Sequence, residues 1–347
     1  MLRGLKQAGL VTAQRYGLFK VVSSSRFRNS KVLILGYHGV SLKDEHQWNP
    51  FAYVSPQTLR QRLEIIKRNK CTVLSLEEAI QHLKHGHLPE RSVVLTFDDG
   101  THDFYSIVLP MLQEFGYPAT VYLTTYYVEN PFPSTPGIWS YLLWKARNVK
   151  VNARKLLDSD VTFDLSSDAG RATAVQQIRS RALSQNLDAR GREALSQRLA
   201  QLLGIDYQQV LDEKVLQLMR PSEIQAVARA GASVQMHMHV HVTPSECRAY
   251  IDNLEENRRF IVNLTRSTPH HFCYPGGVYD QQSVRWLRDH GIESATTCNP
   301  GLTTVKTDRL QIPRLMDCSA ISEMVFESWI VGLGPLIYGH PQRPMHA

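Results

Sequence analysis

Short apolar segments rich in strand-forming residues alternate along this chain with segments of helical periodicity. Residues 31–40 (KVLILGYHGV) and 91–100 (RSVVLTFDDG) are continuous apolar runs, and residues 118–125 (PATVYLTT) form a third run after one helical segment. Strands without polar alternation, joined by helices, are typical of parallel sheets that are buried on both faces. The chain is therefore expected to form an α/β fold built on a parallel sheet or barrel.

The alternation is interrupted from about residue 152 to 218. This segment is polar and helical in pattern, with two amphipathic stretches (QIRSRALSQNL and REALSQRLAQLLG) and no apolar run typical of a strand. The strand and helix alternation resumes at ASVQMHMHVHV. We therefore expect residues 32–347 to form one large domain, with a strand-free helical segment inserted at about 152–218.

The positive charge of the chain is concentrated at its beginning. The net charge is +7, and residues 1–31 hold seven basic side chains and no acidic one: Arg3, Lys6, Arg15, Lys20, Arg26, Arg28 and Lys31. The remaining residues are balanced in charge, which argues against a nucleic-acid partner, since a nucleic-acid-binding domain carries its basic excess on the folded surface. We treat residues 1–31 as a basic leader, helical in part.

Three interpretations of the leader remain open. Polar residues interrupt each of its apolar runs, so it lacks the unbroken apolar core of a secretory signal. It fits an arm packed on the domain, an anchor on an anionic membrane surface or an Arg-rich transit peptide.

The five scattered cysteines show no C-x-x-C spacing, which predicts neither disulfides nor a thiolate zinc site. We expect a cytoplasmic protein, with peripheral contact at the inner membrane face under the second interpretation.

Two groups of polar residues are candidates for chemistry. Asp98 and Asp99 lie side by side where an apolar strand ends, although such a pair is also an ordinary turn. His237, His239 and His241 alternate with apolar residues in VQMHMHVHV, so in an extended segment all three share one face. Clustered histidines without cysteines suit an open, catalytic metal site. One aspartate would then bind the metal while the other takes the proton of a metal-bound water.

These motifs resemble those of the polysaccharide deacetylases, also called the NodB-homology or carbohydrate esterase 4 family. The resemblance rests on LTFDDG, on YPATVYLTT and on the late histidine motif, and it covers roughly residues 32–130 and 218–315. It implies a distorted (β/α) barrel with an inserted helical segment. It also implies a metal-dependent hydrolase that removes N- or O-acetyl groups from sugars.

The resemblance assigns roles to the motif residues. It makes Asp98 the general base and makes Asp99, His237 and His241 the ligands of one divalent metal ion, for which we expect zinc. His239 is then left out of the metal site.

The third motif departs from the family pattern. Cys273 in FCYPGG stands where the family has an arginine, and Gly276 stands where it has an aromatic residue whose backbone N–H binds the oxyanion. Gly276 still offers that N–H. Arg314 in QIPRL is a candidate replacement for the arginine, with an ordinary salt bridge as the alternative. His38, which follows Tyr37 on the first strand, is the candidate general acid, with capping of the strand end as the alternative.

The expected activity is hydrolysis of an amide or ester bond to an acetyl group on a polysaccharide, oligosaccharide or glycolipid sugar, by a metal-bound water that Asp98 activates. The expected partner is an acetylated carbohydrate and not a nucleic acid. An amidohydrolase-type metal hydrolase is one alternative, although that class carries its His-x-His on the first strand. A non-catalytic carbohydrate-binding relative is the other.

Overall fold

A parallel sheet forms the centre of the protein in the computed structural model, which describes residues 2–130, 132–135 and 137–338. Its strands are β1 (Leu33–Tyr37), β4 (Val73–Leu74), β5 (Val93–Phe97), β6 (Thr120–Leu123), β9 (Ser233–Met236), β10 (His271–Cys273), β11 (Ser294–Thr296) and β12 (Leu315–Met316). They lie in the order β11-β10-β9-β6-β5-β1-β12, with β4 also paired to β5, and all of these pairs are parallel.

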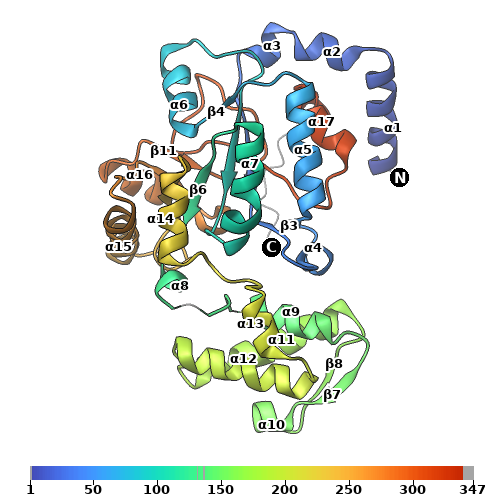
Figure 1. Cartoon of the computed structure of the whole chain (residues 1–347), viewed down its shortest axis with the longest axis vertical. Helices are drawn as coiled ribbons and strands as arrows, with labels where there is room; N and C mark the ends of the chain where they lie inside the picture. The colour runs from blue at the N-terminus through green and yellow to red at the C-terminus, as the bar shows by residue number, and fades with distance from the viewer. Residues whose placement is uncertain (1, 131, 136, 339–347) are drawn as a thin grey trace.

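The segment that contains β12 bridges the two edges of this curled sheet. Leu315 pairs with Leu35 of β1. Just before it, the Ile312 N–H donates to Ala295 of β11 at 2.9 Å, and the Thr297 N–H donates to Ile312 at 2.8 Å. The predicted distorted (β/α) barrel is therefore confirmed, with helices around the curled sheet (Figure 1).

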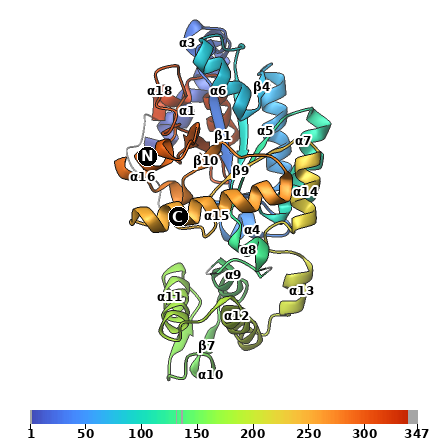
Figure 2. The ribbon, with the colours of Figure 1, turned by 90° about the vertical axis from the view of Figure 1, so that its left-hand side faces the viewer.

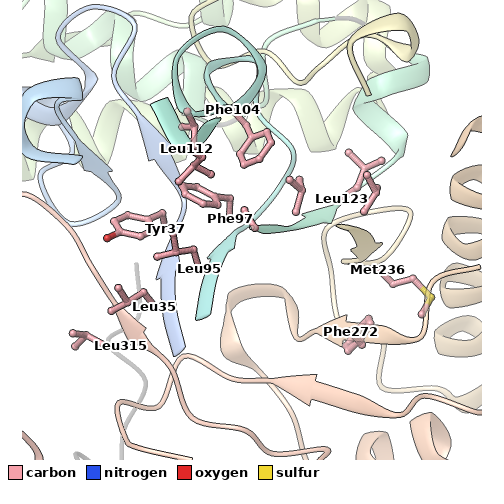
Figure 3. Close-up of a cluster of buried hydrophobic side chains, with 14 of the residues drawn as sticks. Leu35, Tyr37, Leu95, Phe97, Phe104, Leu112, Leu123, Met236, Phe272 and Leu315 are labelled. Atoms are coloured by element: carbon pink, nitrogen blue, oxygen red, sulfur yellow. The ribbon is translucent and has the colours of Figure 1, made fainter. Parts of the chain in front are cut away.

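The barrel is held together by apolar side chains from neighbouring strands and from the helices that cover them. Every residue of β1 and β5 is buried, as their continuous apolar sequences predict. Figure 3 shows side chains from several strands gathered in one cluster, among them Leu35, Leu95 and Phe272. The covering helices include α5 (Pro56–Arg68), α7 (Leu109–Phe115), α14 (Pro221–Arg229) and α15 (Cys247–Thr265).

The inserted segment forms a lobe beneath the barrel in Figures 1 and 2. The lobe has its own apolar cluster, which extends from Ile138 to Leu216. It is built from α9 (Gly137–Lys145), α10 (Arg154–Leu157), α11 (Asp168–Ser184), α12 (Ala189–Leu203), α13 (Tyr207–Asp212) and the strands β7 (Lys150–Asn152) and β8 (Thr162–Asp164). The domain limits given above stay predictions.

The expectation of a strand-free insertion is wrong, because β7 and β8 form an antiparallel hairpin. Each strand has three residues, and only Phe163 among them is buried. A hairpin so short and so exposed leaves no apolar run in the sequence, so its pattern could not be distinguished from that of a loop.

The leader packs on the barrel through α1 (Leu2–Arg15), α2 (Leu18–Ser23) and α3 (Arg26–Asn29), with α1 beside α17 (Glu323–Ile330) (Figure 1). Leu10 and Phe19 are buried against Val331 and Leu333. Arg28 is fully buried and donates to three carbonyl groups, at 2.7 to 3.1 Å. The leader is therefore part of the folded body rather than a separable arm. The side chains of residues 1–8, which include Arg3 and Lys6, lie outside the described part of the chain.

Within the described ranges, no helix combines the length and apolar character needed to cross a membrane.

Candidate active site

Asp98 and Asp99 lie at the end of β5, where the backbone turns sharply. The Asp98 N–H donates to the carbonyl of Tyr37 at 2.8 Å and so continues the sheet. Asp99 and Gly100 have positive φ angles, 67° and 80°, and aspartate tolerates this region better than most residues do. A side chain at Gly100 would collide with Leu123. The turn directs the two adjacent carboxylates to different partners.

Asp98 is bound by Arg314. Two N–H groups of the Arg314 guanidinium donate to the two carboxylate oxygens of Asp98, each at 2.7 Å, and both side chains are buried. The guanidinium also donates to Thr96 Oγ1 at 2.9 Å and to the Thr297 carbonyl at 3.1 Å. Burial would raise the pKa of Asp98, but Arg314 lowers it below its ordinary value. Asp98 is therefore an oriented carboxylate, as a general base must be.

Arg314 reaches Asp98 from the residue before β12, whereas the family pattern places its arginine at position 273, on β10. Cys273 is buried there, with its Sγ 3.1 Å from Arg314 Nη2 and 3.7 Å from Asp98 Oδ2. The small thiol leaves room for a guanidinium that comes from another segment. The Arg314–Asp98 contact is thus observed, and its catalytic role stays a prediction.

Asp99, His237 and His241 converge on one point. The Nε2 atoms of the two histidines lie 3.3 Å and 3.4 Å from Asp99 Oδ1 and 3.2 Å from each other. Ligands placed tetrahedrally at about 2.0–2.1 Å from a zinc ion stand about 3.3–3.4 Å apart. Asp99 Oδ1 is buried and has no hydrogen-bond partner among the described residues. These three residues therefore fit a divalent cation.

The surroundings of this cluster favour a positive charge at its centre. Burial would raise the pKa of Asp99, but His241 and His237 lower it well below its ordinary value. Burial would lower the pKa of His237, but Cys273 and Asp99 raise it overall, whereas for His241 burial outweighs Asp99 and lowers the pKa. His237 Nδ1 lies 2.8 Å from the Cys273 carbonyl, which places one proton on Nδ1 and makes Nε2 the nitrogen at which a metal would replace a second proton.

Asp98, His237 and Cys273 form a second group that is close enough to hold an ion. This group does not fit a cation, because Arg314 occupies both oxygens of Asp98.

The expectation that all three histidines face one way is wrong. β9 ends at Met236, and Met238 has a positive φ of 66°, which breaks the strand alternation. His239 is buried, with its Nδ1 2.9 Å from Thr125 Oγ1, and its carbonyl accepts from Thr125 and Tyr126. It therefore anchors the loop before α8 (Tyr126–Glu129) and does not take part in the cluster.

The two remaining candidates lie on loops around the cluster. His38 directly follows β1, is half-buried and interacts electrostatically with Asp98, Asp99 and His241. Gly276 is exposed and has a positive φ of 58° in the turn after β10. The structure thus places His38 near both carboxylates, while the proposed roles of the two residues stay predictions.

Two supporting residues were missed in the sequence. Thr96 accepts from Arg314, and Asn257 of α15 accepts from the His237 N–H at 3.1 Å and donates to the Leu123 carbonyl at 2.9 Å. Each has a recognisable signal. Thr96 is the polar residue of an apolar strand, and Asn257 is the polar residue on the buried face of α15, which otherwise consists of Tyr250, Leu254 and Ile261.

A cavity of about 500 Å³ opens onto the cluster. Asp99 and His241 line it together with Tyr53 and Tyr127 of the barrel and Trp139 of the lobe. This volume lies in the range of about 300–1,000 Å³ that is typical of small-molecule sites. A substrate at the cluster would thus lie between the barrel and the lobe.

The family model described as polysaccharide deacetylase matches residues 85–295. The chain belongs to the polysaccharide deacetylase family. The predicted membership in a family of carbohydrate-deacetylating hydrolases is confirmed, and the amidohydrolase alternative is not supported. Asp98, Asp99, His237, His241 and Gly276 lie inside the matched segment, whereas His38 and Arg314 lie outside it.

Curated relatives match over short segments. The poly-beta-1,6-N-acetyl-D-glucosamine N-deacetylase of Escherichia coli (strain K12) is 34% identical over 98 residues, which are 28% of this chain and 14% of that protein. The enzyme of the same name from Staphylococcus epidermidis is 28% identical over 115 residues, 30% of this chain and 39% of that protein. The matches thus span well under half the length of these relatives.

Solved structures share the fold over most of the chain. The deacetylase PplD of Streptococcus pyogenes, solved in complex with acetate, has a TM-score of 0.56 at 17% identity and covers 84% of this chain and 94% of that one. IcaB from Ammonifex degensii has a TM-score of 0.53 at 13% identity, and the match covers 88% of this chain and 98% of that one. At these identities the likeness shows the fold alone.

Proposed function

We propose that this polysaccharide deacetylase hydrolyses the N-acetyl amide of an amino sugar within an oligosaccharide or polysaccharide, and that it depends on a divalent metal ion. One observation carries the proposal. The metal-fitting cluster of Asp99, His237 and His241 lies beside Asp98, an oriented and buried carboxylate that Arg314 keeps ionised. The N-acetylglucosamine substrate named for the relatives supports the choice of an amide.

The residues divide the reaction between them. A divalent ion at Asp99, His237 and His241, for which zinc is the simplest choice, would supply Lewis-acid activation of the acetyl carbonyl and of water. Asp98 accepts the proton of the attacking water. The Gly276 N–H donates to the oxyanion of the tetrahedral intermediate. His38 donates a proton to the departing amine, so that acetate and a free amino sugar are released.

Acetate release from β-1,6-linked N-acetylglucosamine oligomers, with and without a chelator, tests this proposal. We expect the chelator to abolish release and added zinc to restore it. Asp98→Asn should lower turnover by roughly 10²–10⁴-fold, the usual contribution of a general base, while the bound metal is retained. Asp289→Asn, at an exposed aspartate, is the matched control and should leave turnover unchanged.

Release that is insensitive to the chelator, or full activity of Asp98→Asn, would contradict the proposed mechanism. A metal-free protein that binds the oligomers without releasing acetate would instead be a non-catalytic relative.

We also propose that the leader rests on an anionic membrane surface. Among the described side chains of residues 9–31, five large apolar ones are exposed, interspersed with basic residues and no acidic one, and these are Val11, Tyr16, Leu18, Val21 and Phe27. Apolar contact combined with basic charge is the usual means of peripheral binding to anionic lipids. A cytoplasmic location, at the inner face of the membrane, stays part of this proposal.

A further inference from the structure

The inserted lobe contributes two arginines to the cavity that opens onto the metal-fitting cluster. Arg179 lies on α11 and Arg192 in the first turn of α12, and both line the same cavity as Asp99 and His241. Figure 2 shows α11 and α12 in the lobe beneath the barrel. The cavity is thus lined both by candidate catalytic groups of the barrel and by two cations of the lobe.

Neither guanidinium is engaged within the described part of the chain. No ion pair or side-chain hydrogen bond involves Arg179 or Arg192 there, whereas Arg171 and Arg181 of α11 each pair with an aspartate. An arginine is charged at any physiological pH, and its planar guanidinium suits carboxylates and phosphates. Two unpaired arginines in one cavity, Arg179 exposed and Arg192 half-buried, are therefore available to an anionic ligand.

The remaining charges of the cavity lead to the same conclusion. Apart from the two arginines, the described residues that line the cavity include only two titratable acid or imidazole groups, Asp99 and His241, and both belong to the metal-fitting cluster. No acidic side chain of the lining is therefore left to balance Arg179 and Arg192. A part of a cavity whose charges are all of one sign, as beside Arg179 and Arg192, concentrates ligands of the opposite sign.

We propose that Arg179 and Arg192 form a subsite for an anionic group on the substrate, a carboxylate or a phosphate carried by the acetylated saccharide. The inference rests on the proposed deacetylation, because it assumes that the acetyl group occupies the Asp99 end of the cavity. The lobe then selects the charge of the substrate, while the barrel performs the chemistry.

Two pairs of probes separate the carboxylate from the phosphate source. The first is a tetrasaccharide of alternating N-acetylglucosamine and glucuronic acid, compared with its carboxyl methyl ester. The second is N-acetylglucosamine 1-phosphate, compared with N-acetylglucosamine. Binding is measured by calorimetry on the zinc-loaded Asp98→Asn protein, and acetate release is measured on the wild type.

We expect at least one anionic probe to bind more tightly than its neutral partner. Arg179→Gln and Arg192→Gln should each lower the affinity for that anionic probe roughly tenfold, as loss of one charge-assisted hydrogen bond does. The affinity for its neutral partner should stay unchanged. Arg179→Lys and Arg192→Lys should restore part of the affinity, since the charge is kept. Arg190→Gln is the matched control, because Arg190 is exposed on α12 and does not line the cavity.

The proposed subsite would be wrong if charged and neutral probes bound with equal affinity. It would also be wrong if Arg190→Gln lowered the affinity for the anionic probe as much as Arg179→Gln and Arg192→Gln do. The two proposals fail separately. Absence of acetate release from every probe by the wild type would contradict deacetylation, while the binding comparison would still decide whether the two arginines recognise an anion.

Discussion

Asp98 carries a buried negative charge that Arg314 balances through two hydrogen bonds. Arg314→Met would leave this carboxylate buried without a partner, and breaking a buried pair in this way costs about 3–5 kcal/mol. We therefore expect the free energy of unfolding to fall by about that amount, and turnover to be lost because the carboxylate would take up a proton. Urea unfolding and acetate release measure the two effects.

Arg309→Met provides the control, since Arg309 is exposed on the same segment. It should change neither stability nor turnover. An Arg314→Met protein with wild-type stability would mean that Asp98 does not need its partner.

Asp103 is a second buried carboxyl group, and it accepts from the Val40 N–H at 2.7 Å. Burial raises the pKa of Asp103 to about 7, whereas in the unfolded chain an aspartate has a pKa of about 3.9. Between these two values the folded state holds a proton that the unfolded state has released. The stability contribution of Asp103 is therefore largest at low pH and declines as pH rises from about 4 to about 7.

Comparison with Asp103→Asn measures this decline, because asparagine keeps an acceptor for Val40 and does not titrate. From pH 5 to pH 7 the wild type should lose roughly 1–3 kcal/mol of unfolding free energy relative to the variant. Parallel stability curves for the two proteins over this interval would show that Asp103 is ionised in the folded state.

At the scale of elements, the leader helices present an apolar and basic surface while their other side packs on α17. Val21 is 68% exposed on α2. Val21→Asp adds a negative charge to this surface and removes apolar contact. We expect it to reduce sedimentation with vesicles that contain phosphatidylglycerol, without changing turnover on soluble oligomers.

Val149→Asp serves as the matched control, because Val149 is 44% exposed in the lobe, between α9 and β7. Its vesicle binding should equal that of the wild type. If both variants bound the vesicles equally, the proposed membrane contact of the leader would be wrong. Only its packing against the barrel would remain.

At the scale of the whole molecule, strand patterns and motif spacing predicted most of the barrel. The apolar runs of β1 and β5 identify strands buried on both faces. The positions of Asp98 and Asp99 at a strand end follow from the same pattern. Residues close in sequence and carried by regular strands were thus placed correctly, because the period of a strand fixes where they lie.

The rest depends on features without a periodic signal. The positive φ of Met238 sends His239 away from the cluster, and a strand pattern does not encode such a break. Asp99 and Arg179 line the same cavity between the barrel and the lobe, and no local pattern in the sequence predicts that they lie together. Arg314 became a candidate only because Cys273 stands where the family has an arginine. Its contact with Asp98 could not be predicted from the sequence, because the closed barrel brings the two residues together.

The distance between those two residues along the chain sets an order of events during synthesis. Asp98 and Arg314 are 216 positions apart. At about 5–20 residues per second, the ribosome needs roughly 10–40 seconds after making Asp98 before it makes Arg314. Until then, burial of the carboxylate would leave it without a counter-charge. The nascent chain therefore gains the Arg314–Asp98 pair and its closed barrel together, once Arg314 has been made.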